Sequence, residues 1–211
     1  MMQSNLYITK PIQEYYDVQY SEQHRAYHNL MHISNMFIYA DYNDMILAEE
    51  QIAAIFFHDF FYDIPSFDIL TNEEQSAIFA YDHMRKHFDY SDKRASIVKN
   101  IILDTREHVP VHGGDWSTPV IDLDLWGLYD ITEYKKIAWL VRKEYGYYNW
   151  KDFSNGRKKW LKSMVSRDSI YCSPYAKGSK KDTLAFKNLN NELKHFTSRD
   201  DWTTYIRGNR K

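Results

Sequence analysis

The sequence almost lacks cysteine, since Cys172 is the only one among 211 residues. That count excludes an intramolecular disulfide and a cysteine-rich zinc site. A lone thiol suits a reducing compartment, so we expect a cytoplasmic protein. Residues 1–10 lack the apolar stretch of a secretion signal. No run of about 18 apolar residues occurs either, so we expect no membrane span.

Glycine and proline are also scarce, with 7 and 5 residues. A turn-dense β fold uses more of both, so their scarcity favours long helices. Apolar residues recur every three to four positions, which is the period of an amphipathic helix. The sequence therefore predicts an all-α fold, a bundle of about eight to nine helices. We expect residues 1–211 to form one domain with a C-terminal helical extension.

An excess of charge of one sign is missing as well. The chain carries 27 basic and 29 acidic residues, a net charge of −2. No overall positive field would attract nucleic acid or an anionic membrane, so we expect neither long nucleic acid nor a membrane as a partner. One local basic cluster stands out, and we interpret it as a solvated helix face with a basic binding surface as the alternative. It comprises Arg157, Lys158, Lys159, Lys162 and Arg167.

Aromatic residues, by contrast, are abundant, with 18 Tyr, 11 Phe and 6 Trp. They predict a core whose polar ring edges are hydrogen-bonded. Thr71 with Glu74 three residues later forms a capping-box pattern, and Ser91 suits an N-cap. In the second predicted helix we expect Met31, Phe37 and Ile38 to face the core. The predicted helices cover residues 12–20, 26–40, 49–61, 71–87, 91–105, 122–128, 132–145, 149–165 and 181–195.

His58 and Asp59 form an adjacent pair on a predicted helix that is otherwise almost wholly apolar. Burying a carboxylate there costs several kcal/mol unless it is compensated. A divalent cation would compensate both residues, because imidazole nitrogen and carboxylate oxygen are good ligands. The alternative, which the dipeptide alone favours, is a salt-bridged aspartate beside a core histidine.

Two further pairs accompany this one. His28 and His32 are four residues apart, so on a helix they would share one face and could ligate a metal or contact a substrate. Asp122 and Asp124 alternate with aliphatic residues and would not share a helical face, so at most one should face a metal. The alternative for this pair is the ordinary acidic start of a helix.

Taken together, these motifs resemble the HD-domain superfamily of metal-dependent phosphohydrolases. Its pattern is a histidine, then a His-Asp pair, then a distant aspartate. The resemblance runs from about residue 20 to 195 and implies an HD-type helical bundle with His32, His58, Asp59 and Asp124 as metal ligands. The matching stretches are Arg25–Asn29 with His32, Phe57–Asp59 with Tyr62 and Asp63, Asn72–Ala77, Thr105 with His108, Asp122–Leu125, Arg142 with Glu144 and Tyr145, and Gly156 with Arg157.

The resemblance also implies roles. The first motif is similar to that of cyclic-nucleotide phosphodiesterases, which makes His28 the general acid and His32 a ligand. In the family's Asp-x-Asp motif the second aspartate usually binds metal, which selects Asp124. From its spacing to Asp59 on the predicted helix, Asp63 is expected to orient or deprotonate water. Residues expected to contact the substrate are Arg25, Glu73, His108 and Arg142, with Arg157 as a further phosphate contact. For the arginines the alternative is an ion pair with Glu22, Glu144 or Asp152, and for Glu73 it is the favourable helix dipole.

The function implied is metal-dependent hydrolysis of a small phosphorylated substrate, a nucleotide above all, by metal-activated water. Phosphomonoesters, diphosphates and cyclic diesters all remain open. The cofactor expected is a divalent ion such as Mn, Mg, Co, Ni, Zn or Fe. We expect one ion, although extra histidines for a second are available at 83, 87, 108 and 112. The alternatives are a di-iron oxygenase and a non-catalytic nucleotide-binding protein.

Overall fold

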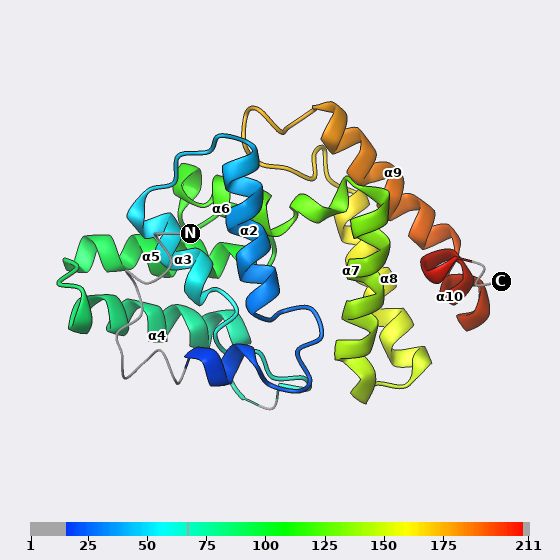
Figure 1. The fold of residues 1–211 in the computed structure, drawn as a ribbon, viewed down its shortest axis with the longest axis horizontal. Coiled ribbons are helices and arrows are strands. Elements are labelled where there is room, and N and C mark those ends of the chain that lie inside the picture. The colour runs from blue at the N-terminus through cyan, green and yellow to red at the C-terminus, as the bar shows by residue number, and fades with distance from the viewer. Residues whose placement is uncertain (1–15, 67, 209–211) are drawn as a thin grey trace. The chain divides into compact units, whose positions relative to one another are not determined.

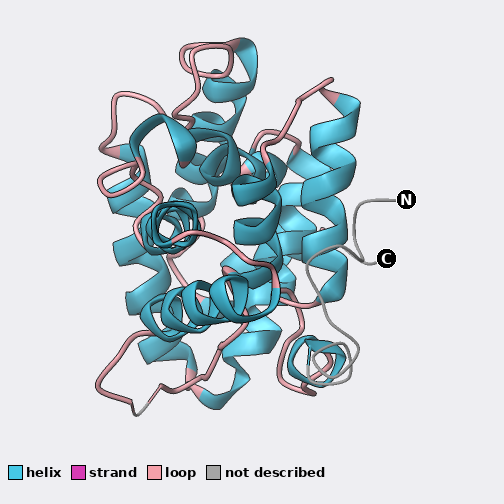
Figure 2. Ribbon diagram, turned by 90° about the vertical axis from the view of Figure 1, so that its left-hand side faces the viewer, coloured by secondary structure: helices cyan, strands magenta, loops and turns pink. Residues whose placement is uncertain are grey.

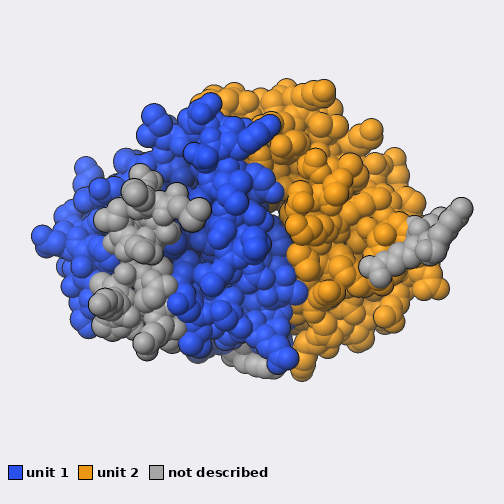
Figure 3. All heavy atoms as spheres, viewed as in Figure 1, with its two compact units in different colours: residues 1–124 blue, residues 125–211 orange. Residues whose placement is uncertain are grey.

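The computed structural model describes residues 16–66 and 68–208. About two thirds of the described residues are helical and none of them lies in a strand, which confirms the all-α prediction (Figure 2). The chain divides into two compact units, Met1–Asp124 and Leu125–Lys211 (Figure 3). No helix in the described ranges has the length and apolar character needed to cross a membrane.

The first unit is built around a short central helix (Figure 1). That helix, α3, is buried from Glu50 to Phe57, and it packs against the helices that flank it. Residues 16–20 are also helical, and Tyr16 and Tyr20 are buried against the same core. The helices of this unit are α2 (Leu30–Tyr42), α3 (Glu49–Phe57), α4 (Asn72–His87), α5 (Asp92–Thr105), the 3-10 helix η1 (Gly114–Trp116) and α6 (Thr118–Asp124).

Local capping signals set two of these helices where the sequence predicted them. The hydroxyl of Thr71 accepts from Glu74 N at 3.2 Å, and the Glu74 carboxylate accepts from Thr71 N at 2.8 Å. This is the predicted capping box at the start of α4. Ser91 caps α5 in the same way, since its hydroxyl accepts from Arg94 N. Both helices therefore begin within one residue of the prediction.

The boundaries of three other helices were predicted wrongly. The helix predicted over 26–40 begins only at Leu30, because the Asn29 side chain caps it by accepting from Met31 N. Met31 and Ile38 are exposed rather than in the core, whereas Phe37 packs on it. The helix predicted over 49–61 ends at Phe57.

The helix predicted over 122–128 is a helix from Thr118 to Asp124 followed by a 3-10 turn. Of the first predicted helix, residues 12–15 lie outside the described residues. The last helix of the chain, Arg199–Arg207, was not predicted.

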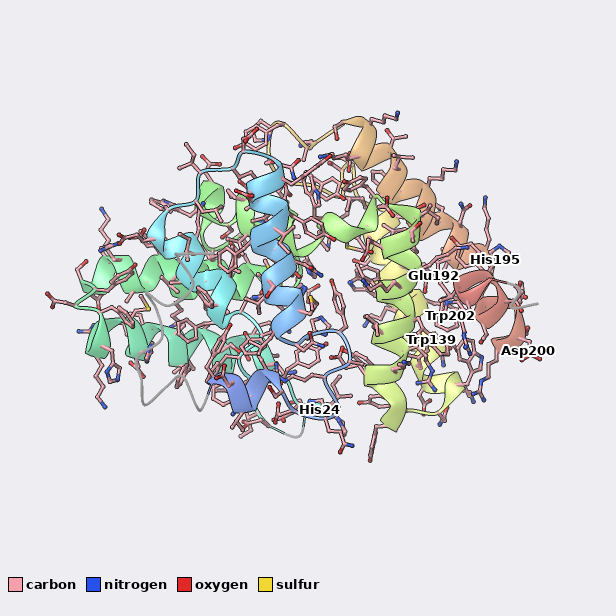
Figure 4. The ribbon with its side chains drawn as sticks, in the orientation of Figure 1. His24, Trp139, Glu192, His195, Asp200 and Trp202 are labelled. Atoms are coloured by element: carbon pink, nitrogen blue, oxygen red, sulfur yellow. The ribbon has the colours of Figure 1, made fainter. Side chains whose placement is uncertain are left out.

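The second unit surrounds a buried glutamate. Its helices are η2 (Trp126–Leu128), α7 (Ile131–Glu144), η3 (Tyr145–Tyr147), α8 (Trp150–Val165), α9 (Lys180–Lys194) and α10 (Arg199–Arg207). Glu192, on α9, is fully buried and accepts two hydrogen bonds from Arg157 at 3.0 and 3.1 Å. It also accepts from Tyr134 OH and, at 3.0 Å, from Trp202 Nε1 (Figure 4). These bonds join the four α-helices of the unit.

Candidate metal centre

His58 and Asp59 lie in the turn that directly follows α3. The amide of His58 still donates to the carbonyl of Ala54, which closes the last turn of the helix. Its Nδ1 lies 3.0 Å from the carbonyl oxygen of Ile55, and only a protonated Nδ1 can donate to a carbonyl. In the neutral imidazole, Nε2 then carries a free lone pair, which is the arrangement that metal-ligating histidines use.

His32 lies in the first turn of α2 and is 3% exposed. Its Nε2 is 3.2 Å from Nε2 of His58 and 3.6 Å from Oδ2 of Asp59. Two neutral imidazole nitrogens with lone pairs facing each other at this distance repel. A proton or a cation between the two nitrogens removes that repulsion.

Asp124 is the last residue of α6, and its carboxylate lies beside the same two histidines. Its Oδ1 is 3.2 Å from His32 Nε2 and 4.0 Å from His58 Nε2. Its Oδ2 lies 3.1 Å from Nε2 of His108. One oxygen of this carboxylate therefore faces the histidine pair, while the other is fixed by His108.

The Oδ2 atom of Asp59 gives the strongest indication that a cation belongs in this group. It is buried, and no donor in the described part of the chain reaches it in hydrogen-bond geometry. His58 Nε2 lies 2.9 Å away, within ion-pair distance, but outside the angles that a hydrogen bond requires. A buried carboxylate oxygen left without a donor is costly, so the arrangement calls for a positive charge at this point.

These atoms fit a metal ion. Nitrogen and oxygen ligands bind transition metals at about 2.0–2.2 Å, so neighbouring donors around one ion lie roughly 3–4 Å apart. The Nε2 atoms of His32 and His58 lie 3.2 Å apart, and each lies 2.9 to 4.0 Å from a carboxylate oxygen of Asp59 and of Asp124. Asp124 approaches the two histidines but is not one of the three residues whose donor atoms are all mutually close. His32, His58 and Asp59 thus form a buried group that could hold a metal ion.

The charges at the centre perturb one another. Burial by itself would lower the pKa of His58, but the carboxylates of Asp59 and Asp124 outweigh it and raise that pKa to about 9. Burial by itself would raise the pKa of Asp59, but the charge of His58, followed by that of His28, holds it well below its ordinary value. The pKa of Asp124 is also held far down against burial, chiefly by hydrogen bonds from His108 and His32. Without an ion, a proton on the imidazoles neutralises the two acids.

Arg25 corrects one expectation from the sequence. Its side chain is fully buried and donates to the backbone carbonyls of Asp59 at 2.6 Å, Phe60 at 2.9 Å and His28 at 3.3 Å. Its Nε donates to Glu22, one of the ion-pair partners considered from the sequence. With these bonds made, Arg25 is not placed to contact a phosphate. It holds the turn that carries the His-Asp pair and explains why α3 ends early.

His28 lies close to the centre, although not for the reason that the sequence suggested. It precedes the N-cap of α2, so it does not share a helical face with His32. Its ring nevertheless lies 5.6 Å from that of His32 and stacks on Tyr62 at 4.2 Å. The carbonyl of Tyr62 is in turn 2.7 Å from His24 Nε2 (Figure 4 labels His24). Tertiary contacts, rather than helix periodicity, place His28.

The other predicted residues are found elsewhere. Asp63 does not share a helical face with Asp59, because α3 has ended by then; it is exposed, and its backbone pairs with the side chain of Asn72. Glu73 lies half-buried in the first turn of α4. Arg142 belongs to the second unit, where it donates to the carbonyls of Tyr145 and Tyr148. The catalytic role of Asp63 and the substrate-binding roles of Glu73 and Arg142 stay predictions.

Asp104 was missed from the sequence. It is 2% exposed and its carboxylate accepts from the amides of Val111, His112 and Gly113 and from the hydroxyl of Ser117. It thereby folds the loop that carries His108 and leads to α6. An acid after the apolar stretch Ile101–Leu103 was a signal of burial that could have identified it.

Comparisons with known proteins found no match. No family model, no curated protein and no solved structure matches the chain.

Proposed function

We propose that the protein is a metal-dependent phosphohydrolase of the HD type. The observation that carries the proposal is the buried Oδ2 of Asp59, which lacks a hydrogen-bond donor and faces the Nε2 atoms of two histidines. His32, His58 and Asp59 would hold the ion, with Asp124 Oδ1 as the fourth ligand. When bound, a divalent ion supplies an acidified water and polarises a phosphoryl oxygen.

The proposed proton donor to the leaving oxygen is His28. Its ring lies beside the ligand group and is only half-buried, so a substrate oxygen can reach it. Stacking on Tyr62 fixes the plane of the imidazole. An imidazole at this position can donate a proton in one step and recover it in the next.

His108 supports the proposal in a role different from the one expected. Its Nε2 lies at hydrogen-bond distance from Asp124 Oδ2, so it orients the carboxylate whose other oxygen faces the centre. Partners of this kind fix the direction and the basicity of a metal ligand. The substrate we propose is a small phosphorylated molecule, a nucleotide above all, in the cytoplasm, where the single cysteine suits the reducing conditions.

The test compares Asp59→Ala with Asp82→Ala, which removes an exposed carboxylate from α4. Each protein is stripped, loaded with Mn, Mg, Co, Ni, Zn or Fe, and measured for bound metal and for phosphate release from nucleotides. We expect the wild type and Asp82→Ala to bind metal and release phosphate, and Asp59→Ala to do neither while keeping its helical circular dichroism.

Two outcomes would contradict the proposal. Unchanged metal content in Asp59→Ala would show that Asp59 does not hold the ion and that the proposed metal centre is wrong. Iron binding with oxygen uptake and no phosphate release would replace hydrolysis by oxygenation.

A further inference from the structure

The near-zero net charge of the chain conceals a division between its two units. Residues 1–124 contain 8 basic and 20 acidic residues, a net charge of −12. Residues 125–211 contain 19 basic and 9 acidic residues, a net charge of +10. The expectation against long nucleic acid relied on the charge of the whole chain, and that reason does not apply to the second unit taken alone.

The exposed residues of the second unit keep this excess of positive charge. Three of its nine acids, Glu144, Asp182 and Glu192, are buried. Within the described residues, eleven lysines and arginines of this unit are exposed against four acids. Little negative charge is left to balance the exposed cations.

Helix α8 concentrates these cations on one side. At 3.6 residues per turn, Lys151, Lys158 and Lys162 fall within a sector of about 40°, and Lys159 lies about 60° beyond it. Lys158 is half-buried, with its Nζ 5.5 Å from the centroid of the Phe196 ring, and the other three lysines are exposed. They span about 16 Å along the axis. The opposite face, with Phe153, Leu161 and Met164, is buried in the unit. None of the four lysines has an ion-pair partner among the residues that the structure describes. Arg157, grouped with them in the sequence, instead lies against Glu192.

Two aromatic rings of the same unit are exposed. Tyr147, four residues before Lys151, is 72% exposed, and Tyr175 is 75% exposed. Basic residues that follow a phosphate backbone, together with rings on which bases stack, are the common features of sites for single-stranded nucleic acid. A membrane-surface helix would instead need an exposed apolar face. The only other large exposed hydrophobic residue in the described part of this unit is Ile131.

We propose that the α8 lysine stripe, defined as Lys151, Lys158, Lys159 and Lys162, binds single-stranded nucleic acid through its phosphate backbone. Tyr147 supplies a ring for base stacking. The contact is led by charge and does not depend on base sequence, because phosphates carry no sequence information. The four lysines belong to the second unit, whereas the proposed metal ligands all come from the first.

The experiment measures binding of fluorescein-labelled dT20 and U20 to the full-length chain by anisotropy, over a series of salt concentrations. The test variant changes all four stripe lysines to Gln. The matched control changes Lys177, Lys180, Lys187 and Lys194 to Gln, which removes the same charge from exposed positions in and just before α9. Metal content and tryptophan fluorescence verify that each variant is folded.

We expect the stripe variant to lose at least about tenfold in affinity at 0.1 M salt, and the control to lose less than about threefold. Neutralising four phosphate contacts should also make the slope of log affinity against log salt shallower by about 3. Tyr147→Ala should lower affinity about fivefold or more at an unchanged slope, since it removes stacking and not charge.

Four results would overturn the proposal. The wild type fails to bind either oligonucleotide, or the stripe and control variants lose affinity equally. Vesicles of anionic phospholipid bind as tightly as the oligonucleotides and lose binding in the stripe variant. Light scattering shows a dimer that dissociates in the stripe variant, which would assign the lysines to the acidic unit of a second copy.

Discussion

Arg25 shows how one buried side chain sets the geometry of a site that it does not join. Its guanidinium donates to the carbonyls of Asp59 and Phe60 in the turn, to the carbonyl of His28, and to the carboxylate of Glu22. The sequence offered no sign of this role, because an arginine beside Tyr27 and His28 looks the same whether it meets phosphate or backbone. The pairs His32 and His58–Asp59, in contrast, were identifiable because their residue types are costly to bury without a cation.

Replacing Arg25 by Ala should destabilise the first unit by about 3 kcal/mol, because it leaves buried carbonyls without a donor. Metal affinity should fall as well, since the turn that presents His58 and Asp59 loses its support. Urea unfolding and metal titration measure the two effects. Arg85→Ala, at a residue whose side chain is half exposed, is the control and should change stability by less than about 0.5 kcal/mol. Equal effects of the two substitutions would contradict the assigned role.

His58 makes the stability of the metal-free protein depend on pH. Because folding raises its pKa to about 9, the proton contributes stability that is complete below pH 6.5 and is lost as the pH rises through 9. The loss amounts to at most about 3 kcal/mol. Metal binding has the opposite dependence, because the ion must displace that proton, so affinity should rise over the same range.

Urea midpoints at pH 6 and pH 9.5, with EDTA and with saturating Mn, test this prediction. The midpoint should fall with pH in EDTA, and the extra stability conferred by Mn should grow. His58→Asn should show a smaller fall in EDTA than the wild type. A metal-free protein that becomes more stable between pH 6.5 and 9 would argue against the assigned pKa.

At the scale of elements, prediction succeeded where a boundary is determined locally. Thr71 and Glu74 satisfy each other's backbone within one turn, so the start of α4 could be read from four residues. The end of α3 depends instead on Arg25, which is more than thirty residues away in sequence. Helix α10 was not predicted, because its two buried residues, Trp202 and Ile206, form too short an apolar pattern.

The loop between α5 and α6 is organised by Asp104, so a change there should reach the centre through His108. Asp104→Asn puts an NH₂ group where the Gly113 amide and the Ser117 hydroxyl now donate. We expect a loss of about 2 kcal/mol in stability and about tenfold in metal affinity. Asp115→Asn, at an exposed position of the same loop, should leave both unchanged. Intact affinity in Asp104→Asn would show that the loop does not position Asp124.

At the scale of the whole molecule, the unfolding of the two units can be followed by different signals, tryptophan fluorescence for the second unit and bound metal for the first. Five of the six tryptophans lie in the second unit, the exception being Trp116, whereas the metal ligands lie in the first. The boundary between the units could not be predicted, because no glycine- or proline-rich linker marks residues 124 and 125. Summed over the whole chain, the opposite charges of the units cancelled, which hid their difference.

Glu192→Gln should destabilise the second unit by about 3 kcal/mol, because Arg157 would remain buried without its counter-charge. Tryptophan fluorescence should show unfolding at lower urea, while bound metal is retained at urea concentrations where the fluorescence has already changed. Asp200→Asn, at an exposed site, serves as the control. Simultaneous loss of metal and fluorescence would mean that the two units unfold together.

The proposed ligands come from positions 32, 58, 59 and 124, on segments that are distant in sequence. An ion bound to all of them would fasten these segments to one another and close two long loops of the chain. Such a fastening restricts the unfolded chain much as a covalent cross-link does. The single cysteine cannot form an internal disulfide, so the ion would be the cross-link of this chain. Trypsin should therefore cut the first unit faster once a chelator has removed the ion.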